Sequence, residues 1–440
     1  MAMDIVDTST PVVILKLEHY GSLGIARSLG QWGILVAGVD ANPGAPTFRS
    51  RYCANPFVWN LDGEDPAGTV NVLLTIHKKL GRRALLIPTS DETAQFVATY
   101  ADPLREGFMF PCQPAELVRS LCSKKSMFFL VKSLGLPTAE CFFPRTRAEV
   151  LRFSRQARFP LMLKGINGGL LEKRTGKKMV IVRNEYELIR FDEAMEDHSN
   201  PNLMMQEYIP GGDDSVWMFN GYFNANSECL FGFTGKKIRQ NPVYTGMTSL
   251  GVCLPNEVVT QLTLRLAKAI GYRGILDIGF RYDSRDNQYK VLDVNPRIGA
   301  TFRLFVGKQG MDVARAMYLD MTGQEVPADN PSWGRKWIVE DKDLRSTYCY
   351  FRDGNLAFSE WLGSFRGIEE AGYFSLRDPI PFLAMCLTHL KRSVQRLTAR
   401  LFLRHSLPAR EAMDLDDRVG TGLTGTRVEM SSPAGDYRHA

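Results

Sequence analysis

The chain has 440 residues, which exceeds the roughly 250–300 residues at which one hydrophobic core stops growing, so we expect two or three domains. Hydrophobic residues make up 44% and charged residues 23%, which is typical of a globular protein and excludes a disordered or fibrous one. The net charge of +6 suits small anionic substrates but, without a basic stripe, does not indicate a nucleic-acid partner.

The spacing of metal-binding and redox residues argues against a zinc or disulfide protein. The eight cysteines are scattered, and the six histidines form no paired motif. Residues 1–11 lack the basic and apolar regions of a signal peptide, and no run of 18 apolar residues occurs. We therefore expect buried thiols, no transmembrane segment and a cytoplasmic location.

The first part of the chain alternates strands and helices. The predicted strands are 12–15, 34–39 and 84–87, and the predicted helices are 25–32 and 70–80. Residues 21–24 read as a turn, and 88–92 read as a turn that caps the next helix. This alternation predicts a parallel, doubly wound α/β sheet over residues 1–115.

Beyond residue 115 the pattern becomes α+β, starting with a helix over 116–134. The predicted strands are 161–164, 179–182 and 203–206, and the later helices are 257–270 and 312–321. We divide this part into a smaller lobe at 116–206 and a larger lobe at 207–325.

A C-terminal extension over 330–405 ends in an amphipathic helix. Its apolar positions alternate at spacings of four and three: Leu383, Leu387, Leu390, Val394, Leu397 and Leu401. Such a face suits packing on its own domain, a membrane surface or a second copy. Gly, Thr, Ser, Asp and Arg dominate residues 406–440, which predicts a disordered tail.

A hairpin late in the chain carries the sharpest chemical signal. Residues 289–297 read as a strand that ends in Asp-Val-Asn-Pro-Arg, and alternation puts Asp293 and Asn295 on one face. The preceding strand carries Asp277, and pairing across the turn at 283–287 brings it near Asp293. Side-chain oxygens gathered in this way suit Mg²⁺, and Arg297 offers a fork of donors to a phosphate. The structural alternative is a hairpin with an exposed polar face.

Two lysines form a second signal. Lys124 starts a helix after Ser123, a suitable N-cap residue, and Lys164 ends an apolar strand. A loop with Gly168 and Gly169 follows Lys164, and glycines let backbone N–H groups approach phosphate oxygens. Two surface lysines beside an ordinary loop are the alternative reading.

The segment 204–214 forms a third signal, in which a strand carrying Gln206 and Glu207 runs into a turn. The backbone at Tyr208 and Ile209 could pair with an adenine edge, and Asp214 could reach ribose hydroxyls. A hairpin with acidic tips is the alternative.

The motifs, taken in the order in which they occur along the chain, resemble those of the ATP-grasp superfamily over residues 11–325. The stretch from Lys124 to Gly135-Leu136-Pro137 is similar to one of its conserved segments, and residues 378–381 resemble a carboxylate–amine ligase branch similar to D-aspartate ligase. The resemblance implies a Rossmann-like N-terminal domain followed by a two-lobed ATP-grasp fold. Three positions depart from the family pattern: Ser123 replaces an acid, Asp293 replaces a Glu, and the loop after Lys164 holds fewer glycines.

The resemblance also implies a role for each matching position. The nucleotide would be held by Lys124, Lys164, Gly168, Gly169, Gln206, Glu207, Tyr208, Ile209 and Asp214. The metal ligands would be Asp277, Asp293 and Asn295, holding Mg²⁺ or Mn²⁺. The substrate would be held by Lys236, Arg239, Arg297 and Arg303, with Arg297 and Lys164 as the catalytic residues.

These roles imply an ATP-dependent ligase that converts a carboxylate to an acyl phosphate and transfers the acyl group to an amine or similar nucleophile, releasing ADP and phosphate. The acid would be an amino acid or a small carboxylic acid, and homodimers are common among such ligases. Two alternatives remain from the sequence. One is a non-catalytic ATP-binding or scaffold protein of the same fold. The other is an NAD(P)-dependent oxidoreductase, although the full Gly-x-Gly-x-x-Gly motif is missing at residues 19–24.

Overall fold

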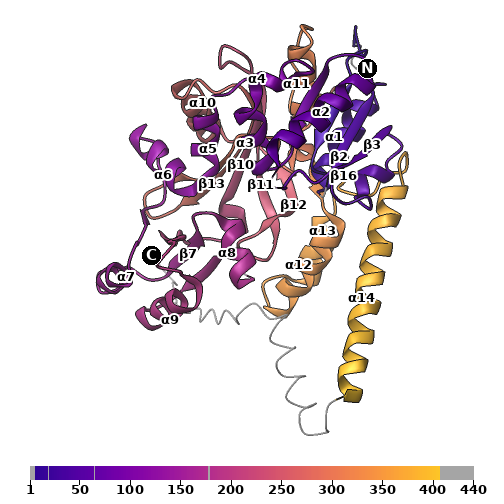
Figure 1. Ribbon diagram of the computed structural model, residues 1–440. Helices are drawn as coiled ribbons and strands as arrows, with labels where there is room; N and C mark the ends of the chain where they lie inside the picture. Colours follow the sequence, from indigo (N-terminus) through magenta and orange to yellow (C-terminus); the bar gives the residue numbers. More distant parts are fainter. Residues whose placement is uncertain (1–4, 18, 64, 177–178, 407–440) are drawn as a thin grey trace, which may run out of the picture.

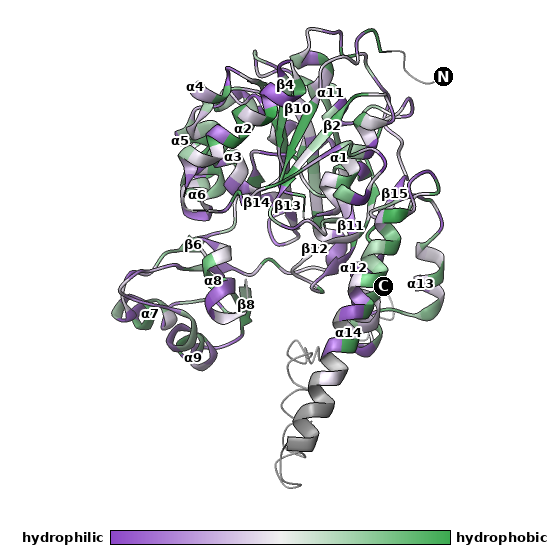
Figure 2. Cartoon of the chain, turned by 45° about the vertical axis from the view of Figure 1, so that its right-hand side comes forward, coloured by the Kyte–Doolittle hydropathy of each residue, from purple (hydrophilic) through white to green (hydrophobic). Residues whose placement is uncertain are grey.

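The computed structural model describes residues 5–17, 19–63, 65–176 and 179–406. Three sheets organise the chain: a five-stranded sheet near the N terminus, a four-stranded sheet in the middle and a seven-stranded sheet that reaches into the C-terminal extension. Figure 2 shows the four-stranded sheet and its helices set apart from the body formed by the other two.

The N-terminal sheet is parallel throughout, as the alternation of strands and helices predicted, with strand order β3-β2-β1-β4-β5. Its strands are β1 (Val12–Leu15), β2 (Val36–Asp40), β3 (Asn55–Val58), β4 (Ala84–Pro88) and β5 (Phe108–Met109). Its helical segments are α1 (Tyr20–Gly30), η1 (Pro46–Arg49), α2 (Pro66–Leu80), α3 (Asp91–Thr99) and α4 (Ala101–Leu104). Apolar clusters cover both faces, because Val12 and Ile14 belong to one cluster and Val13 and Leu15 to another.

The predicted turn at 21–24 is wrong, because these residues lie inside α1. The two glycines serve close packing instead. A Cβ at Gly21 would lie 2.8 Å from the Cα of Ala300, and one at Gly24 would lie 2.9 Å from the Cγ of Arg303. The start of α1 is therefore pressed against the segment that follows the Asp-x-Asn-Pro-Arg motif.

The four-stranded sheet forms a small lobe with strand order β6-β9-β7-β8 and antiparallel pairs. Its strands are β6 (Cys141–Phe142), β7 (Leu161–Gly165), β8 (Met179–Val182) and β9 (Leu203–Glu207), and its helices are α7 (Arg147–Ser154), α8 (Gly168–Thr175) and α9 (Glu185–Met195). A separate apolar cluster that includes Leu163, Leu188 and Met205 holds this lobe together.

The seven-stranded sheet forms the large lobe, with order β14-β13-β10-β11-β12-β15-β16. Its strands are β10 (Val216–Phe223), β11 (Cys229–Asn241), β12 (Met247–Cys253), β13 (Gly274–Asp283), β14 (Gln288–Asn295), β15 (Lys336–Ile338) and β16 (Ile368–Ala371). Its helical segments are η2 (Asp213–Ser215), α10 (Glu257–Ala269), η3 (Phe302–Leu304) and α11 (Val313–Met321). The predicted helices at 257–270 and 312–321 are confirmed as α10 and α11.

Two of the predicted segment boundaries differ from the structure. The helix expected at 116–134 is two helices, α5 (Ala115–Cys122) and α6 (Lys124–Ser133), because Ser123 leaves the helical conformation and caps α6. Leu121, Met127 and Val131 pack in the apolar cluster of the large lobe, so both helices belong there and not to the small lobe. At the other end, β15 and β16 of the 330–405 extension complete the large sheet.

The C-terminal extension adds three helices, α12 (Glu340–Arg352), α13 (Phe358–Ser364) and α14 (Ile380–Ser406). In Figure 1, α14 runs along the edge of the molecule and away from the N-terminal sheet. Within the described part of the chain, no helix is long and apolar enough to span a membrane. The predicted tail at 406–440 lies outside the described residues from 407 onward.

Candidate active site

Asp277, Asp293 and Asn295 meet on one face of the β13–β14 hairpin. The register places Asp277 opposite Asn295 and Gly279 opposite Asp293. Asn295 Nδ2 lies 3.1 Å from Asp293 Oδ2 and 3.3 Å from Asp277 Oδ2. A side chain at Gly279 would clash with the carboxylate of Asp293, so this glycine makes room for it. The hairpin geometry inferred from the sequence is therefore present.

The electrostatics of this cluster suit a cation. The pKa of Asp277 is raised to about 6, chiefly by burial and also by the negative charge of Asp293, while the charge of Arg297 opposes the shift. Asn220 Nδ2 donates to Asp277 Oδ1 at 3.4 Å, while Asn220 Oδ1 is buried and has no hydrogen-bond partner among the described residues. Two carboxylates and two amides therefore lie in contact on this face, and side chains of these types supply the oxygen ligands that Mg²⁺ requires.

Arg297 joins this cluster to the N-terminal domain. Its Nε donates to Asp91 Oδ1 at 2.9 Å, and its Nη2 donates to Asn295 Oδ1 at 3.2 Å. Asp91 is the first residue of α3, whose N terminus Ser90 caps. Sequence analysis missed Asp91 as a site residue. The sequence around Asp91 showed only a capped turn at 88–92. That turn predicts the start of a helix, but it does not predict the contact with Arg297.

Lys164 of the small lobe and Lys124, at the start of α6 on the large lobe, lie near the carboxylates. Lys164 Nζ donates to Gln206 Oε1 at 2.7 Å. The pKa of Lys164 is lowered to about 8, chiefly by burial and also by the positive charge of Lys124, while the charge of Asp293 opposes the shift. A Cβ at Gly168 would lie 3.5 Å from Lys124 Nζ, so Lys124 reaches the glycine segment. Lys124 therefore lies beside the glycine segment, and both Lys124 and Asp293 lie near enough to Lys164 for their charges to act on it.

The glycine segment itself differs from the expected loop. Gly168 and Gly169 form the first turn of helix α8, and Asn167 caps it by accepting from the backbone of Leu170 at 3.2 Å. The short stretch between Gly165 and Gly168 leaves no room for a long loop. The backbone N–H groups of this helix start, rather than those of a flexible loop, are the donors available here.

Comparisons with known proteins identify the family of the chain. No family model matches the chain. It is 24% identical to D-aspartate ligase of Enterococcus faecium over 328 residues, which cover 71% of this chain and 77% of the relative. The chain belongs to the ATP-grasp superfamily. It is an ATP-grasp ligase that forms carbon–nitrogen bonds.

Solved structures share the ATP-grasp fold at low identity. One is the biotin carboxylase domain of Hydrogenobacter thermophilus 2-oxoglutarate carboxylase in complex with MgADP, ADP and bicarbonate, with a TM-score of 0.57 and 16% identity over 74% of this chain and 72% of that one. Another is L-amino acid ligase from Bacillus licheniformis, with a TM-score of 0.55 and 14% identity over 75% of this chain and 79% of that one.

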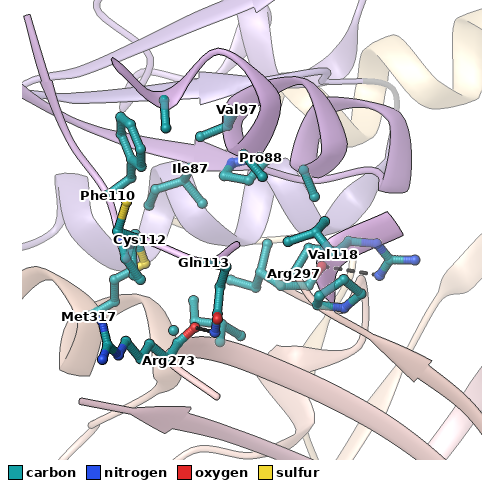
Figure 3. Close-up of a pocket in the computed structure, with 18 of the residues that line it drawn as sticks. Ile87, Pro88, Val97, Phe110, Cys112, Gln113, Val118, Arg273, Arg297 and Met317 are labelled. Carbon is teal, nitrogen blue, oxygen red and sulfur yellow. Dashed lines mark hydrogen bonds between the residues drawn. The ribbon is translucent and has the colours of Figure 1, made fainter. Parts of the chain in front are cut away.

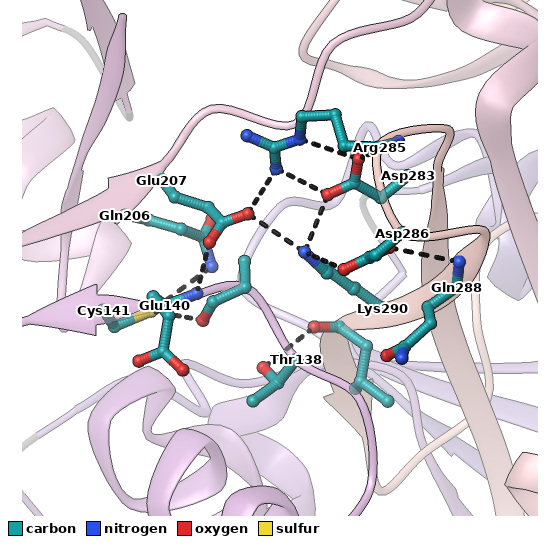
Figure 4. A network of polar contacts seen from close by, with 12 residues as sticks. Thr138, Glu140, Cys141, Gln206, Glu207, Asp283, Arg285, Asp286, Gln288 and Lys290 are labelled. Atoms are coloured by element: carbon teal, nitrogen blue, oxygen red, sulfur yellow. Dashed lines mark hydrogen bonds and ion pairs between the residues drawn. The ribbon is translucent and has the colours of Figure 1, made fainter. Parts of the chain in front are cut away.

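Glu207 ties the two ATP-grasp lobes together (Figure 4). Its Oε1 lies 2.5 Å from Arg285 Nη2 and 3.1 Å from Lys290 Nζ, both on the β13–β14 hairpin. Its Oε2 accepts from the backbone N–H of Glu140 at 3.2 Å. These partners occupy both carboxylate oxygens of Glu207. Asp214 lies exposed in η2, beyond the hinge.

Lys236, a predicted substrate contact, lies on the face of β11 away from the carboxylates, because side chains on a strand alternate between faces. Asn220 lies opposite both Asp277 and Phe233, so Lys237, four positions after Phe233, shares the face of the carboxylates. Lys236 lies opposite Trp217 on the other face. Burial lowers the pKa of Lys237, while Asp293 and Asp277 oppose this shift through their charge.

Arg239 and Arg303, two further predicted substrate contacts, are instead paired inside the protein. Arg239 is buried and forms a two-pronged ion pair with Asp343 of α12 at 2.8 and 2.7 Å. Arg303 pairs in the same way with Glu370 of β16 at 2.8 and 2.7 Å, and it also donates to Asp312. Both guanidinium groups therefore hold the C-terminal extension on the large lobe, and we withdraw them as substrate contacts.

An apolar pocket lies beside the charged site, between α3 and the start of β13 (Figure 3). Its lining includes Val97, Phe110, Val118 and Met317, with Arg297 at one edge. Apolar walls of this kind do not suit a triphosphate.

Proposed function

We propose that this ligase uses ATP to phosphorylate a carboxylate and transfers the acyl group from the acyl phosphate to an amine, releasing ADP and phosphate. One observation carries the proposal. Lys164 of the small lobe lies close enough to Asp293 and Lys124 of the large lobe that the charges of both shift its pKa. A bound triphosphate with its cation would be complementary to these positive and negative groups.

The nucleotide would lie with its phosphates against Lys124, Lys164 and the start of α8. Lys164 is buried and costly to keep charged, so an anionic phosphate beside it would restore its preference for the charged form. Gln206, which accepts from Lys164, would fix the direction of the ammonium group. The adenine would pair with the backbone of Tyr208 and Ile209, and Asp214 would bind the ribose.

Asp277, Asp293 and Asn295 would hold Mg²⁺ beside the phosphates, with Mn²⁺ as a substitute. The support is the set of side chains: the carboxylates of Asp277 and Asp293, the amide of Asn295 that contacts both, and the buried oxygen of Asn220, whose amide contacts Asp277. When bound, the metal would neutralise charge on the transferring phosphoryl group. Asp277 must lose its proton to serve as a metal ligand. Because its pKa is about 6, most of the population has lost this proton above about pH 6.

Arg297 would bind the carboxylate and then the phosphoryl oxygens as charge develops on them. It sits between Asn295 and Asp91, which hold its guanidinium in one orientation. A preoriented donor of this kind stabilises a transition state without reorganising. The bond from oxygen to phosphorus forms as the terminal phosphoanhydride bond breaks, and the amine then displaces phosphate from the acyl carbon. Closure of the small lobe would keep water from the acyl phosphate.

For the acid we propose an amino acid or a small carboxylic acid, and for the nucleophile an amine. Support comes from the likeness to D-aspartate ligase, whose name specifies an amino acid. The cationic groups Lys237 and Arg297 would accept an anionic substrate. We also propose a cytoplasmic location, where ATP is abundant.

The decisive experiment measures ADP and phosphate release over a panel of amino acids and carboxylic acids, with and without amine acceptors. We expect release that requires both an acid and an amine. With an acid labelled by oxygen-18 in its carboxylate, the released phosphate should carry the label, because one carboxylate oxygen leaves with the phosphoryl group. Asp293→Asn should abolish release while the protein stays folded. Acid-dependent release of unlabelled phosphate would exclude the acyl phosphate, and a lack of release over the whole panel would leave only ATP binding.

A further inference from the structure

Helix α14 leaves the body of the protein with little to cover it. From Cys386 to Thr398, every side chain that the structure describes is exposed. In Figures 1 and 2, the helix extends past the other helices of the C-terminal extension. A helix of this length with no tertiary partner along most of its course needs another source of stability.

Only the start of α14 is anchored to the body. Pro381 and Met385 are buried, and Met385 belongs to the main apolar cluster. Just before the helix, buried Asp378 pairs with Arg27 of α1 at 2.9 Å and accepts from Ser50 Oγ at 2.7 Å. These contacts fix where the helix begins. The contact of His389 Nε2 with Asp341 Oδ2 of α12, at 3.2 Å, keeps it alongside α12.

The exposed side of α14 carries an unbroken apolar stripe. It consists of Ile380, Leu383, Leu387, Leu390 and Val394, whose exposed fractions run from 52% to 61%. At 100° per residue, this stripe lies on the side of the helix opposite Pro381 and Met385. The stripe therefore faces away from the body, and no part of the chain that the structure describes covers it.

The spacing of the stripe is that of a heptad repeat. Ile380, Leu387 and Val394 take the a positions, and Leu383 and Leu390 take the d positions. The sequence continues the pattern with Leu397 at d and Leu401 at a. Leucine at every d position, with β-branched residues among the a positions, favours two parallel strands.

We propose that α14 forms a parallel, two-stranded coiled coil with α14 of a second copy of this chain. The residues that flank the stripe suit such a pair. In the parallel register, Cys386 would lie next to Lys391 of the other copy, and Ser393 next to Thr398. Neither pair sets like charges against each other, so nothing at the flanks opposes association.

The same pattern argues against binding of α14 to a lipid surface. A helix that lies in a membrane interface needs a broad apolar face, often with aromatic residues. Here small or polar residues, Ala384, Cys386 and Lys391, border the stripe, which leaves the narrow seam typical of a coiled coil. Because the seam faces away from each body, the two bodies would lie on the outer sides of the helix pair without colliding.

Sedimentation equilibrium of the full chain at micromolar concentration tests this proposal, which does not depend on the reaction. We expect twice the chain mass of 49.5 kDa for the wild type. The Leu387→Glu/Leu390→Glu variant should sediment as a monomer, because charges at the seam would be buried and unpaired. The matched control Thr388→Glu/Gln395→Glu changes outward positions and should remain a dimer. Circular dichroism and ADP release verify that each variant is folded.

Crosslinking tests the orientation. In a Cys386→Ser background, Leu390→Cys should form a disulfide with its own counterpart on mild oxidation, whereas Gln395→Cys should not. A monomeric wild type, or a Leu387→Glu/Leu390→Glu variant that stays dimeric, would overturn the proposal. Sedimentation of a monomeric wild type with phosphatidylglycerol vesicles, but not with phosphatidylcholine vesicles, would assign the helix to a lipid surface instead. A dimer without the Leu390→Cys crosslink would exclude the parallel register.

Discussion

Arg297 Nε lies 2.9 Å from Asp91 Oδ1, although the two residues are 206 positions apart in the sequence. The contact links the helix start of an N-terminal α/β domain to the strand end that carries the carboxylate cluster. Asp91 thereby holds the guanidinium beside Asn295, and the candidate active site needs the N-terminal domain to be complete.

This contact predicts that Asp91 acts through Arg297. Arg297→Lys should lower kcat about a hundredfold, because lysine lacks the fork of donors that holds developing charge. Asp91→Asn should cost roughly 10–100-fold, as loss of an orienting partner does. Steady-state kinetics of both variants and of the double variant measure the coupling. Fully additive losses would show that Asp91 acts independently of Arg297.

A proton should enter the site when ATP binds. Because the pKa of Lys164 is held at about 8, part of the population is neutral near pH 8, and the phosphates would raise the pKa again. Binding at pH 8 should therefore take up as much as about half a proton, falling towards zero near pH 6. Calorimetry in buffers of different ionisation enthalpy measures this number. In Lys164→Met the uptake should disappear, and an unchanged uptake would assign the proton to another group.

Lys237 and Lys236 provide a matched pair. Lys237→Ala should lower kcat/KM about tenfold or more, because the ammonium group of Lys237 shares the face of Asp277 and Asp293. Lys236→Ala should leave kcat/KM close to that of the wild type, because Lys236 lies on the other face. Both variants remove one lysine from the same strand, so their charge and truncation are equal. Kinetics at saturating ATP distinguish them, and a larger loss for Lys236→Ala would mean that the opposite face of β11 serves the substrate.

Breaking the ion pair between Arg239 and Asp343 should destabilise the fold. Each side chain is 3% exposed, so Asp343→Ala leaves a buried charge unpaired and should cost about 3–5 kcal/mol in the free energy of unfolding. Urea unfolding measures this loss. Asp102→Ala, which breaks the exposed pair with Arg105, is the control and should have little effect.

The double variant Arg239→Met/Asp343→Leu separates structure from substrate binding. It removes both charges and should recover most of the stability, because apolar residues replace buried ion pairs at little cost. Its KM for the acid should match that of the wild type. A stable double variant with a strongly raised KM would return Arg239 to the substrate site.

The sequence by itself determined the features that depend on nearby residues. Asp277, Asp293 and Asn295 could be placed together because a short hairpin turn fixes the register of two adjacent strands and alternation fixes their faces. The parallel N-terminal sheet followed from the order of strands and helices, and the heptad stripe of α14 from the spacing of its leucines. These are properties of chain geometry over a few dozen residues.

Tertiary structure alone decided which partners meet across the domains. The sequence could not distinguish Lys237 from Lys236, because one position on a strand selects the face and only the packed sheet shows which face holds the carboxylates. Nor could it pair Arg239 with Asp343 or Arg297 with Asp91, since any arginine carries the same charge until the fold gives it a neighbour. Contacts between distant segments are set by the packing of whole domains, and no local pattern of residues encodes them.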